Sequence, residues 1–156
     1  MIARDIMTRN VRSVAPSTSL RDVAKVMISR RISAVPVIDR RAQVLGIVSE
    51  GDFLQRRAWW LAFFAGEGSP ARELANGRKL QAQDVMTAPV ISVAEQTGVG
   101  EIIDILERCK IKRVPVLRGG KLVGIVSRRD IVRGLRNGTK GTRLLARNLT
   151  VRSDGK

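Results

Sequence analysis

The chain of 156 residues contains an internal repeat, and this repeat constrains the fold more than any other feature of the sequence. Asp5-Ile6-Met7-Thr8 recurs as Asp84-Val85-Met86-Thr87. At the same offset, Ser33-Ala34-Val35-Pro36-Val37 recurs as Lys112-Arg113-Val114-Pro115-Val116. Motifs that keep both their order and their spacing predict two copies of one structural unit.

A third motif closes each copy. Gly46-Ile47-Val48-Ser49, with Asp52 after it, recurs as Gly124-Ile125-Val126-Ser127, with Asp130 after it. The offset is now shorter by one residue. The change falls at Gly119-Gly120, a hairpin-turn signal in a segment where a change of length costs little free energy. The repeat therefore extends from the first motif to the last one.

Each copy has the local pattern of a β-α-β-β-α unit. In the first copy we expect a short strand near residues 11–14 and a helix capped by Ser19, whose apolar residues recur at helical spacing. Residues 34–38 and 44–49 predict two strands, and a second helix is expected from about Gly51. One copy cannot cover both faces of so small a sheet. The predicted fold class is α/β (α+β), with two repeats packed about a pseudo-twofold axis.

The composition excludes several kinds of catalytic site. The chain has no histidine, and therefore no imidazole zinc ligand, Ser-His-Asp triad or histidine general base. Its single cysteine, Cys109, cannot form an internal disulfide, which favours a reducing compartment. The longest apolar stretch is too short to span a bilayer, and the N-terminus lacks the apolar core of a secretory signal. We expect a soluble cytoplasmic protein that is not an enzyme and needs neither a metal nor a cofactor.

The net charge of +15 is concentrated in the first copy and in the C-terminal stretch. A solvated surface explains such an excess without any partner. The functional alternative is an anionic partner, either a nucleic acid or a small phosphorylated ligand.

The three motifs resemble those of the cystathionine-β-synthase-type (CBS) domain, and their duplication resembles the tandem CBS pair called a Bateman module. The resemblance places CBS repeat 1 at residues 1–57 and CBS repeat 2 at residues 84–135. An aromatic helix extension and linker would then occupy residues 58–83, and residues 136–156 would form a basic C-terminal tail.

CBS pairs generally act as regulatory modules that bind adenosyl ligands such as AMP, ADP, ATP or S-adenosylmethionine in clefts between the repeats. The resemblance implies that Asp52 and Asp130 bind the ribose hydroxyls, which a carboxylate can do by accepting two hydrogen bonds from the diol. The helix that follows each strand would offer free N–H groups to a phosphate. Ser-x-x-Asp is also an ordinary N-capping arrangement, and the two roles can coexist. A regulated partner protein is expected in trans.

The resemblance implies two inequivalent sites, each drawing on both repeats. The expected site with Asp52 consists of Ser49, Asp52, Thr87, Ile111, Lys112 and Arg113. The expected site with Asp130 consists of Thr8, Ile32, Ser33, Ala34, Ser127, Arg128, Arg129 and Asp130. Cations at both sites favour a phosphorylated ligand, whereas Glu50 would repel a phosphate if it pointed inward. The sites are expected to prefer different ligands, or only one of them is expected to be occupied.

Four of the chain's aromatic residues cluster between the repeats: Trp59, Trp60, Phe63 and Phe64. At i,i+4 spacing they are typical of a packing surface rather than of a base-binding or membrane-binding site. We expect them to pack partly against this module and partly against a second subunit, in a homodimer.

Two alternatives stay open. The basic tail and the first repeat would suit a nucleic-acid-binding protein, whose binding depends steeply on salt. A constitutive dimeric scaffold with empty sites would instead dimerise without responding to any nucleotide.

Overall fold

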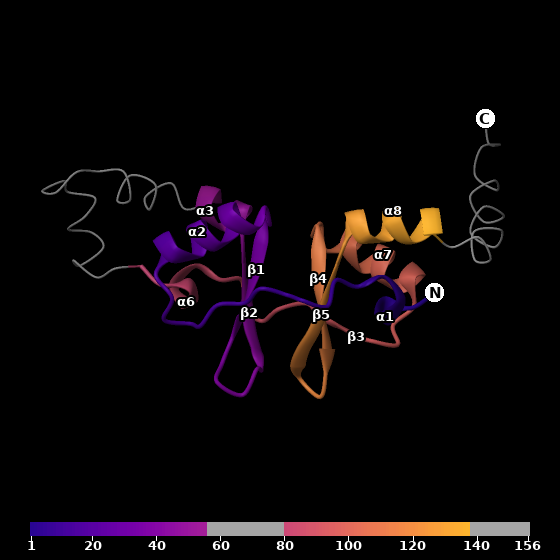
Figure 1. The fold of residues 1–156 in the computed structure, drawn as a ribbon, viewed down its shortest axis with the longest axis horizontal. Coiled ribbons are helices and arrows are strands. Elements are labelled where there is room, and N and C mark those ends of the chain that lie inside the picture. The colour runs from indigo at the N-terminus through magenta and orange to yellow at the C-terminus, as the bar shows by residue number, and fades with distance from the viewer. Residues whose placement is uncertain (56–79, 138–156) are drawn as a thin grey trace, which may run out of the picture. The chain divides into compact units, whose positions relative to one another are not determined.

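The computed structural model describes residues 1–55 and 80–137 (Figure 1). The chain divides into two compact units, neither of which is a continuous stretch of sequence. Unit 1 contains Met1–Asn10, Ser92–Arg118 and the chain from Val123 onwards, and unit 2 contains Val11–Ile91 with Gly119–Leu122. The start of each sequence repeat therefore belongs to the unit that holds the rest of the other repeat.

Unit 2 is a small sheet with helices packed on it. Its described elements are α2 (Leu20–Arg30), β1 (Ala34–Ile38), β2 (Val44–Ser49), α3 (Glu50–Gln55) and α6 (Ala82–Val85). The strands β1 and β2 are antiparallel, with Val35 opposite Val48, and both lie at their predicted bounds. Valines of the two strands pack against one face of α2 to form the core, together with Ala82 and Val85 of α6.

The predicted start of α2 is confirmed. The Asp22 N–H donates to the Ser19 hydroxyl oxygen at 3.2 Å, which satisfies one of the free N–H groups of the first turn. The helix ends at Arg31, whose φ of 52° is left-handed. The residues that α2 buries are Leu20, Val23 and Met27, as the helical spacing predicts.

Unit 1 repeats this design with one more strand. Its described elements are α1 (Ala3–Ile6), β3 (Val93–Ala94), α7 (Val99–Arg108), β4 (Arg113–Arg118), β5 (Lys121–Ser127), whose first two residues are counted with unit 2, and α8 (Arg128–Asn137). The sheet order is β3-β4-β5, and β3 is parallel to β4. Gly119 and Gly120 join β4 to β5 with φ angles of 57° and 77°, so the predicted Gly-Gly turn is confirmed in the conformation that glycine favours.

The predicted strand near residues 11–14 is wrong, because the structure has only a single parallel bridge there, between Val14 and Val37. Val14 N–H donates to Pro36 O, and Ile38 N–H donates to Val14 O, each at 3.0 Å. The next hydrogen bond of a parallel ladder would need an N–H at Pro16, which proline lacks. In the second copy, Glu95 takes this position and the two-residue strand β3 forms.

Two short helices, α1 and α6, were not predicted. Each starts two residues before an Asp-x-Met-Thr motif and contains the first two residues of that motif. Helix α1 is held in unit 1 by the hydrogen bond from Ala3 N–H to Thr97 O at 2.8 Å. Helix α6 is held in unit 2 by the equivalent bond from Ala82 N–H to Thr18 O, also at 2.8 Å. None of the helices in the described parts of the chain has both the length and the apolar character needed to cross a membrane.

Candidate functional site

Each unit packs the methionine of an Asp-x-Met-Thr motif onto the glycine of a Gly-Ile-Val-Ser motif. Met86 lies against Gly46 of β2, and a β-carbon on Gly46 would stand 2.6 Å from the Met86 sulfur. In unit 1, Met7 covers Gly124 of β5 in the same way. Any larger residue than glycine would collide with the methionine, so the two motifs depend on each other.

The threonine after each methionine is fixed to the same strand by two backbone hydrogen bonds. Thr87 N–H donates to Ile47 O at 2.9 Å, and Ile47 N–H donates to Thr87 O at 3.1 Å. Thr8 and Ile125 exchange the same two bonds at 2.9 and 3.0 Å. This pairing brings each threonine hydroxyl to the first turn of the helix that follows the strand.

Unit 2 thereby assembles the Asp52 site, which we define as Ser49, Asp52 and Thr87. The Asp52 Oδ2 accepts the Ser49 N–H at 2.6 Å and the Ser49 hydroxyl at 2.7 Å. The Asp52 Oδ1 accepts the Thr87 hydroxyl at 3.1 Å. Asp52 is half-buried, and among the described residues only these two neighbours bond to its carboxylate. One side of Oδ1 is left to accept a further hydrogen bond.

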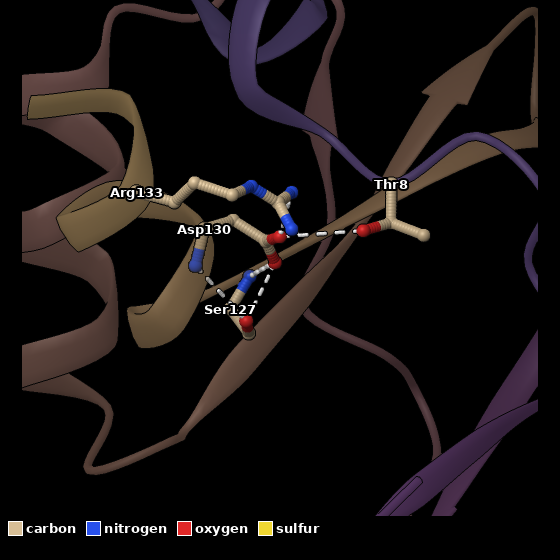
Figure 2. A network of polar contacts seen from close by, with 4 residues as sticks. All are labelled: Thr8, Ser127, Asp130 and Arg133. Atoms are coloured by element: carbon tan, nitrogen blue, oxygen red, sulfur yellow. Dashed lines mark hydrogen bonds and ion pairs between the residues drawn. The ribbon is translucent and has the colours of Figure 1, made fainter. Parts of the chain in front are cut away.

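Unit 1 assembles the Asp130 site from Thr8, Ser127, Asp130 and Arg133, as Figure 2 shows. The Asp130 Oδ2 accepts the Ser127 N–H at 2.8 Å and the Ser127 hydroxyl at 2.5 Å. The Asp130 Oδ1 accepts the Thr8 hydroxyl at 3.2 Å and a guanidinium N–H of Arg133 at 2.6 Å. The Asp130 side chain is only 7% exposed, so this carboxylate is buried and fully paired.

Both carboxylates also cap the helix on which they lie. In α8 the capping is reciprocal, because the Asp130 N–H donates to the Ser127 hydroxyl oxygen at 3.3 Å while the carboxylate accepts the Ser127 N–H. The capping alternative is therefore present in the structure. It does not exclude a ligand role at Asp52, because that carboxylate keeps acceptor capacity.

The structure brings together part of each predicted site. Thr87 was expected at the site of Asp52 and Thr8 at the site of Asp130, and both hydroxyls donate to those carboxylates. Arg128 and Arg129 lie exposed in the first turn of α8. Arg133 was missed, although an arginine three positions after an aspartate on a helix is a recognisable i,i+3 pair.

The segments before the two Val-Pro-Val motifs lie in different units. Residues 32–34 are in unit 2, where Ser33 O accepts the Glu50 N–H at 3.1 Å. Residues 111–113 are in unit 1, where Lys112 O accepts the Arg128 N–H at 3.2 Å. Each segment thus contacts the first turn of the helix that carries its own repeat's aspartate. Their predicted contribution to the aspartate site of the other repeat stays a prediction.

An open hollow of about 660 Å³ lies in unit 2 between α2 and α3. Its lining is mostly apolar and includes the predicted site residues Ile32 and Ser33, together with Phe53. The carboxylate of Glu50, next to the Asp52 site in sequence, also belongs to the lining. The lining also includes Arg31, whose charge opposes that of Glu50, and its mostly apolar character suits an apolar group.

Some predictions fall on residues that the structure does not describe. The aromatic cluster Trp59, Trp60, Phe63 and Phe64 lies outside the described residues, as does the tail beyond Asn137. In the parts of the chain that the structure does describe, no group of three or more cysteine, aspartate or glutamate side chains could hold a metal ion.

The comparison with known families follows the same division into repeats. The model of the CBS domain matches residues 3–58 and 82–137. Among curated proteins, the chain is 29% identical over 145 residues to CBSX2, a chloroplastic CBS domain-containing protein of Arabidopsis thaliana. The match covers 83% of this chain and 61% of that protein, so the chain spans about three fifths of its relative.

Solved structures show the same fold. The crystal structure of CBSX2 in complex with AMP has a TM-score of 0.74 at 27% identity, covering 87% of this chain and 96% of that one. The CBS domain of a membrane protein from Sphaerobacter thermophilus has a TM-score of 0.65 at 38% identity, with 85% and 86% covered. The CBS domain pair of MJ0100, in complex with 5′-methylthioadenosine and S-adenosyl-L-methionine, has a TM-score of 0.66 at 25% identity, with 85% and 98% covered. With two family matches that together cover more than half of its length, this chain belongs to the CBS domain family and is a tandem CBS domain pair.

Proposed function

We propose that this CBS pair is a regulatory module that binds an adenosyl ligand, such as AMP, ADP, ATP or S-adenosylmethionine, at the Asp52 and Asp130 sites. The observation that carries the proposal is the duplicated arrangement of serine, aspartate and threonine. In each unit a carboxylate at the start of a helix is held in one orientation by a serine and by a threonine from the other sequence repeat.

The chemistry of this arrangement suits a ribose. A vicinal diol needs a fixed acceptor, and a carboxylate whose Oδ2 is already bonded to the preceding serine presents its Oδ1 at a fixed angle. Holding the acceptor in place before binding reduces the entropy that the ligand must offset. The relatives CBSX2, solved with AMP, and the CBS pair of MJ0100, solved with two adenosyl compounds, support the choice of ligand class.

The module is proposed to act on a partner protein in trans rather than to catalyse a reaction. No cofactor is part of the proposal, and the adenosyl ligand acts only as a regulator. The changing balance of adenine nucleotides is the signal that such a site would sense. Its cytoplasmic location belongs to the proposal as well.

A homodimer is part of the proposal too. Two helices expose large apolar side chains, with Ile28 of α2 at 78% exposure and Val132 of α8 at 67%. Covering either side chain in a dimer would remove its apolar surface from water, which favours association. Light scattering on the full chain should give twice the monomer mass, and Ile28→Ser with Val132→Ser should lower it; a monomeric mass for the unaltered chain would contradict the dimer.

Calorimetric titration of the full chain with AMP, ATP and S-adenosylmethionine tests the binding function. Asp52→Asn and Asp130→Asn each keep the shape of the side chain but remove its charge, and each should weaken binding at its own site about tenfold or more. Asp104→Asn is the matched control, because it removes an exposed carboxylate from α7. If no compound of the panel binds, or if both site variants bind as the unaltered chain does, the proposal is wrong.

A further inference from the structure

The two aspartate sites differ in one charged contact, which lies on the helix α8. Arg133 donates to Oδ1 of Asp130 at 2.6 Å, and Figure 2 shows its guanidinium lying over the carboxylate beside the Thr8 hydroxyl. The repeat places Gln55, the last residue of α3, at the corresponding position after Asp52. A glutamine cannot supply the positive charge of an arginine, so the position three residues after the aspartate differs in charge between the two repeats.

The contact fills the acceptor capacity of Asp130. A carboxylate offers about four acceptor positions. At Asp130 these are taken by the Ser127 N–H, the Ser127 hydroxyl, the Thr8 hydroxyl and the Arg133 guanidinium. At Asp52 the described residues take three. As far as the described residues go, a ribose diol can bind Asp52 without displacing a donor, whereas at Asp130 it must displace one.

Arg133 is the donor that can leave. The Thr8 main chain is fixed to Ile125 by two hydrogen bonds, and the Ser127 N–H belongs to the cap of α8. The Arg133 side chain is 49% exposed and flexible, so it can turn away from Asp130 towards solvent. Its departure alone would leave a buried carboxylate short of a charged partner, which is costly. An anionic group on the ligand would lower this cost by giving the guanidinium a new partner beside the site.

Resting on the proposed function, we infer that Arg133 makes the Asp130 site selective for anionic adenosyl ligands. A nucleoside 5′-phosphate carries its charge on the same ribose that offers the diol. It can therefore take Oδ1 of Asp130 and the Arg133 guanidinium together. An uncharged nucleoside offers the diol only and competes with Arg133 for the same oxygen. Among the described residues, no cation bonds to the Asp52 carboxylate.

The test compares AMP with adenosine by calorimetry on the full chain, in an Asp52→Asn background that leaves the Asp130 site as the main binding site. AMP should bind about tenfold or more tightly than adenosine. Adding Arg133→Gln should weaken AMP binding and strengthen adenosine binding, so that the ratio of the two affinities falls about tenfold. Arg133→Lys should restore part of the ratio. Arg136→Gln, which removes an exposed arginine from the same helix, should leave the ratio unchanged.

The outcomes separate the inference from the function on which it rests. If Arg133→Gln still binds AMP and leaves the ratio of AMP to adenosine affinity unchanged, the inference is overturned and the proposed function is kept. The inference is also overturned, and the proposed function kept, if Asp52→Asn abolishes all binding, because the Asp130 site would then hold no ligand. If neither compound binds the unaltered chain and the wider panel also fails, both are overturned. Because the ratio is taken within one variant, a change in its stability does not affect the result.

Discussion

Met86 lies so close to Gly46 that a β-carbon on the glycine would stand 2.6 Å from the methionine sulfur. The two residues are far apart in the chain, and they belong to two of its three repeated motifs. The contact brings Thr87 to the strand β2, where Ile47 pairs with it. A glycine without any catalytic or binding atom thus sets the position of a hydroxyl in the Asp52 site.

Replacing Gly46 by alanine should therefore destabilise the protein. The added methyl group must displace Met86 or the backbone at Thr87, which is expected to cost about 1–3 kcal/mol of unfolding free energy. Urea denaturation measures the change. Gly100→Ala is the matched control, because nothing lies within 4 Å of the new methyl group in α7, and alanine favours a helix by about 1 kcal/mol over glycine. If Gly46→Ala and Gly100→Ala had the same unfolding free energy, the close contact between Gly46 and Met86 would be contradicted.

The exchange of N-terminal segments between the units predicts where a methionine substitution acts. Met7 is 7% exposed in the core of unit 1, so Met7→Ala should cost about 2–5 kcal/mol and speed amide hydrogen exchange in β5. Met86→Ala, at the equivalent position, should speed exchange in β2 instead. If Met7→Ala loosened β2, within its own sequence repeat, the assignment of α1 to unit 1 would be wrong.

Thr8 and Thr87 should differ in how much their hydroxyl groups stabilise the fold. Both donate to an aspartate Oδ1, but Asp130 is 5% exposed and Asp52 is half-buried. Removing a donor from a buried carboxylate costs more, so Thr8→Val should lower the unfolding free energy by about 1–3 kcal/mol and Thr87→Val by less. Thermal unfolding of both variants checks the order, with Thr8→Ser and Thr87→Ser as controls that keep the hydroxyl. A larger loss of unfolding free energy in Thr87→Val than in Thr8→Val would show that burial of the carboxylate does not decide how much each hydroxyl stabilises the fold.

Much of the fold could be predicted because its signals are local. The strands at Ala34–Ile38 and Val44–Ser49 follow from runs of β-branched residues between turns, and Ser19 marks the start of α2 by its own hydrogen bond. The family resemblance placed Thr87 with Asp52 and Thr8 with Asp130, but the residues alone do not predict the exchange of α1 and α6 between the units. It depends on which copy of Gly-Ile-Val-Ser each methionine packs against, and both copies offer the same glycine.

Less of the Asp52 and Asp130 sites than of the fold could be predicted from the sequence. The motif marks Asp52 and Asp130 as equivalent, whereas their difference comes from Arg133, a residue outside the motif. Residues 32–34 and 111–113 were assigned from the resemblance, and their hydrogen bonds to Glu50 and Arg128 depend on tertiary folding. Pro16 was a signal in the sequence against the strand near residues 11–14, because proline lacks the N–H that would continue a parallel ladder.

Glu95 predicts a dependence of stability on pH. Its carboxylate is 3% exposed and bonds to two nitrogens of Arg118, at 2.5 and 2.8 Å. The hydrogen bonds from Arg118, with the nearby charges of Arg118, Arg4 and Arg9, hold the pKa of Glu95 below its ordinary value of 4.5. The stabilisation is therefore complete above about pH 4.5 and is lost as the pH falls through the lower pKa of the folded state.

Urea unfolding at pH 6 and pH 3 measures this dependence. Glu95→Gln should be less stable than the unaltered chain at pH 6, and the gap should narrow at pH 3 because both side chains are then nearer to neutral. Glu107→Gln, which changes an exposed glutamate of α7, controls for the loss of one charge. A gap of the same size at both pH values would show that the ion pair does not titrate as described.

The division of the chain into units also fixes an order of assembly during synthesis. The main part of unit 2, Val11–Ile91, is continuous and leaves the ribosome before the larger part of unit 1. Residues 1–10 emerge before it, but their partners in unit 1 begin only at Ser92 and extend to α8. Domains generally fold as units, starting from the N-terminal part of a growing chain. Residues 1–10 are therefore translated before unit 2 and packed after it, so the Asp130 site is complete only when α8 has been made.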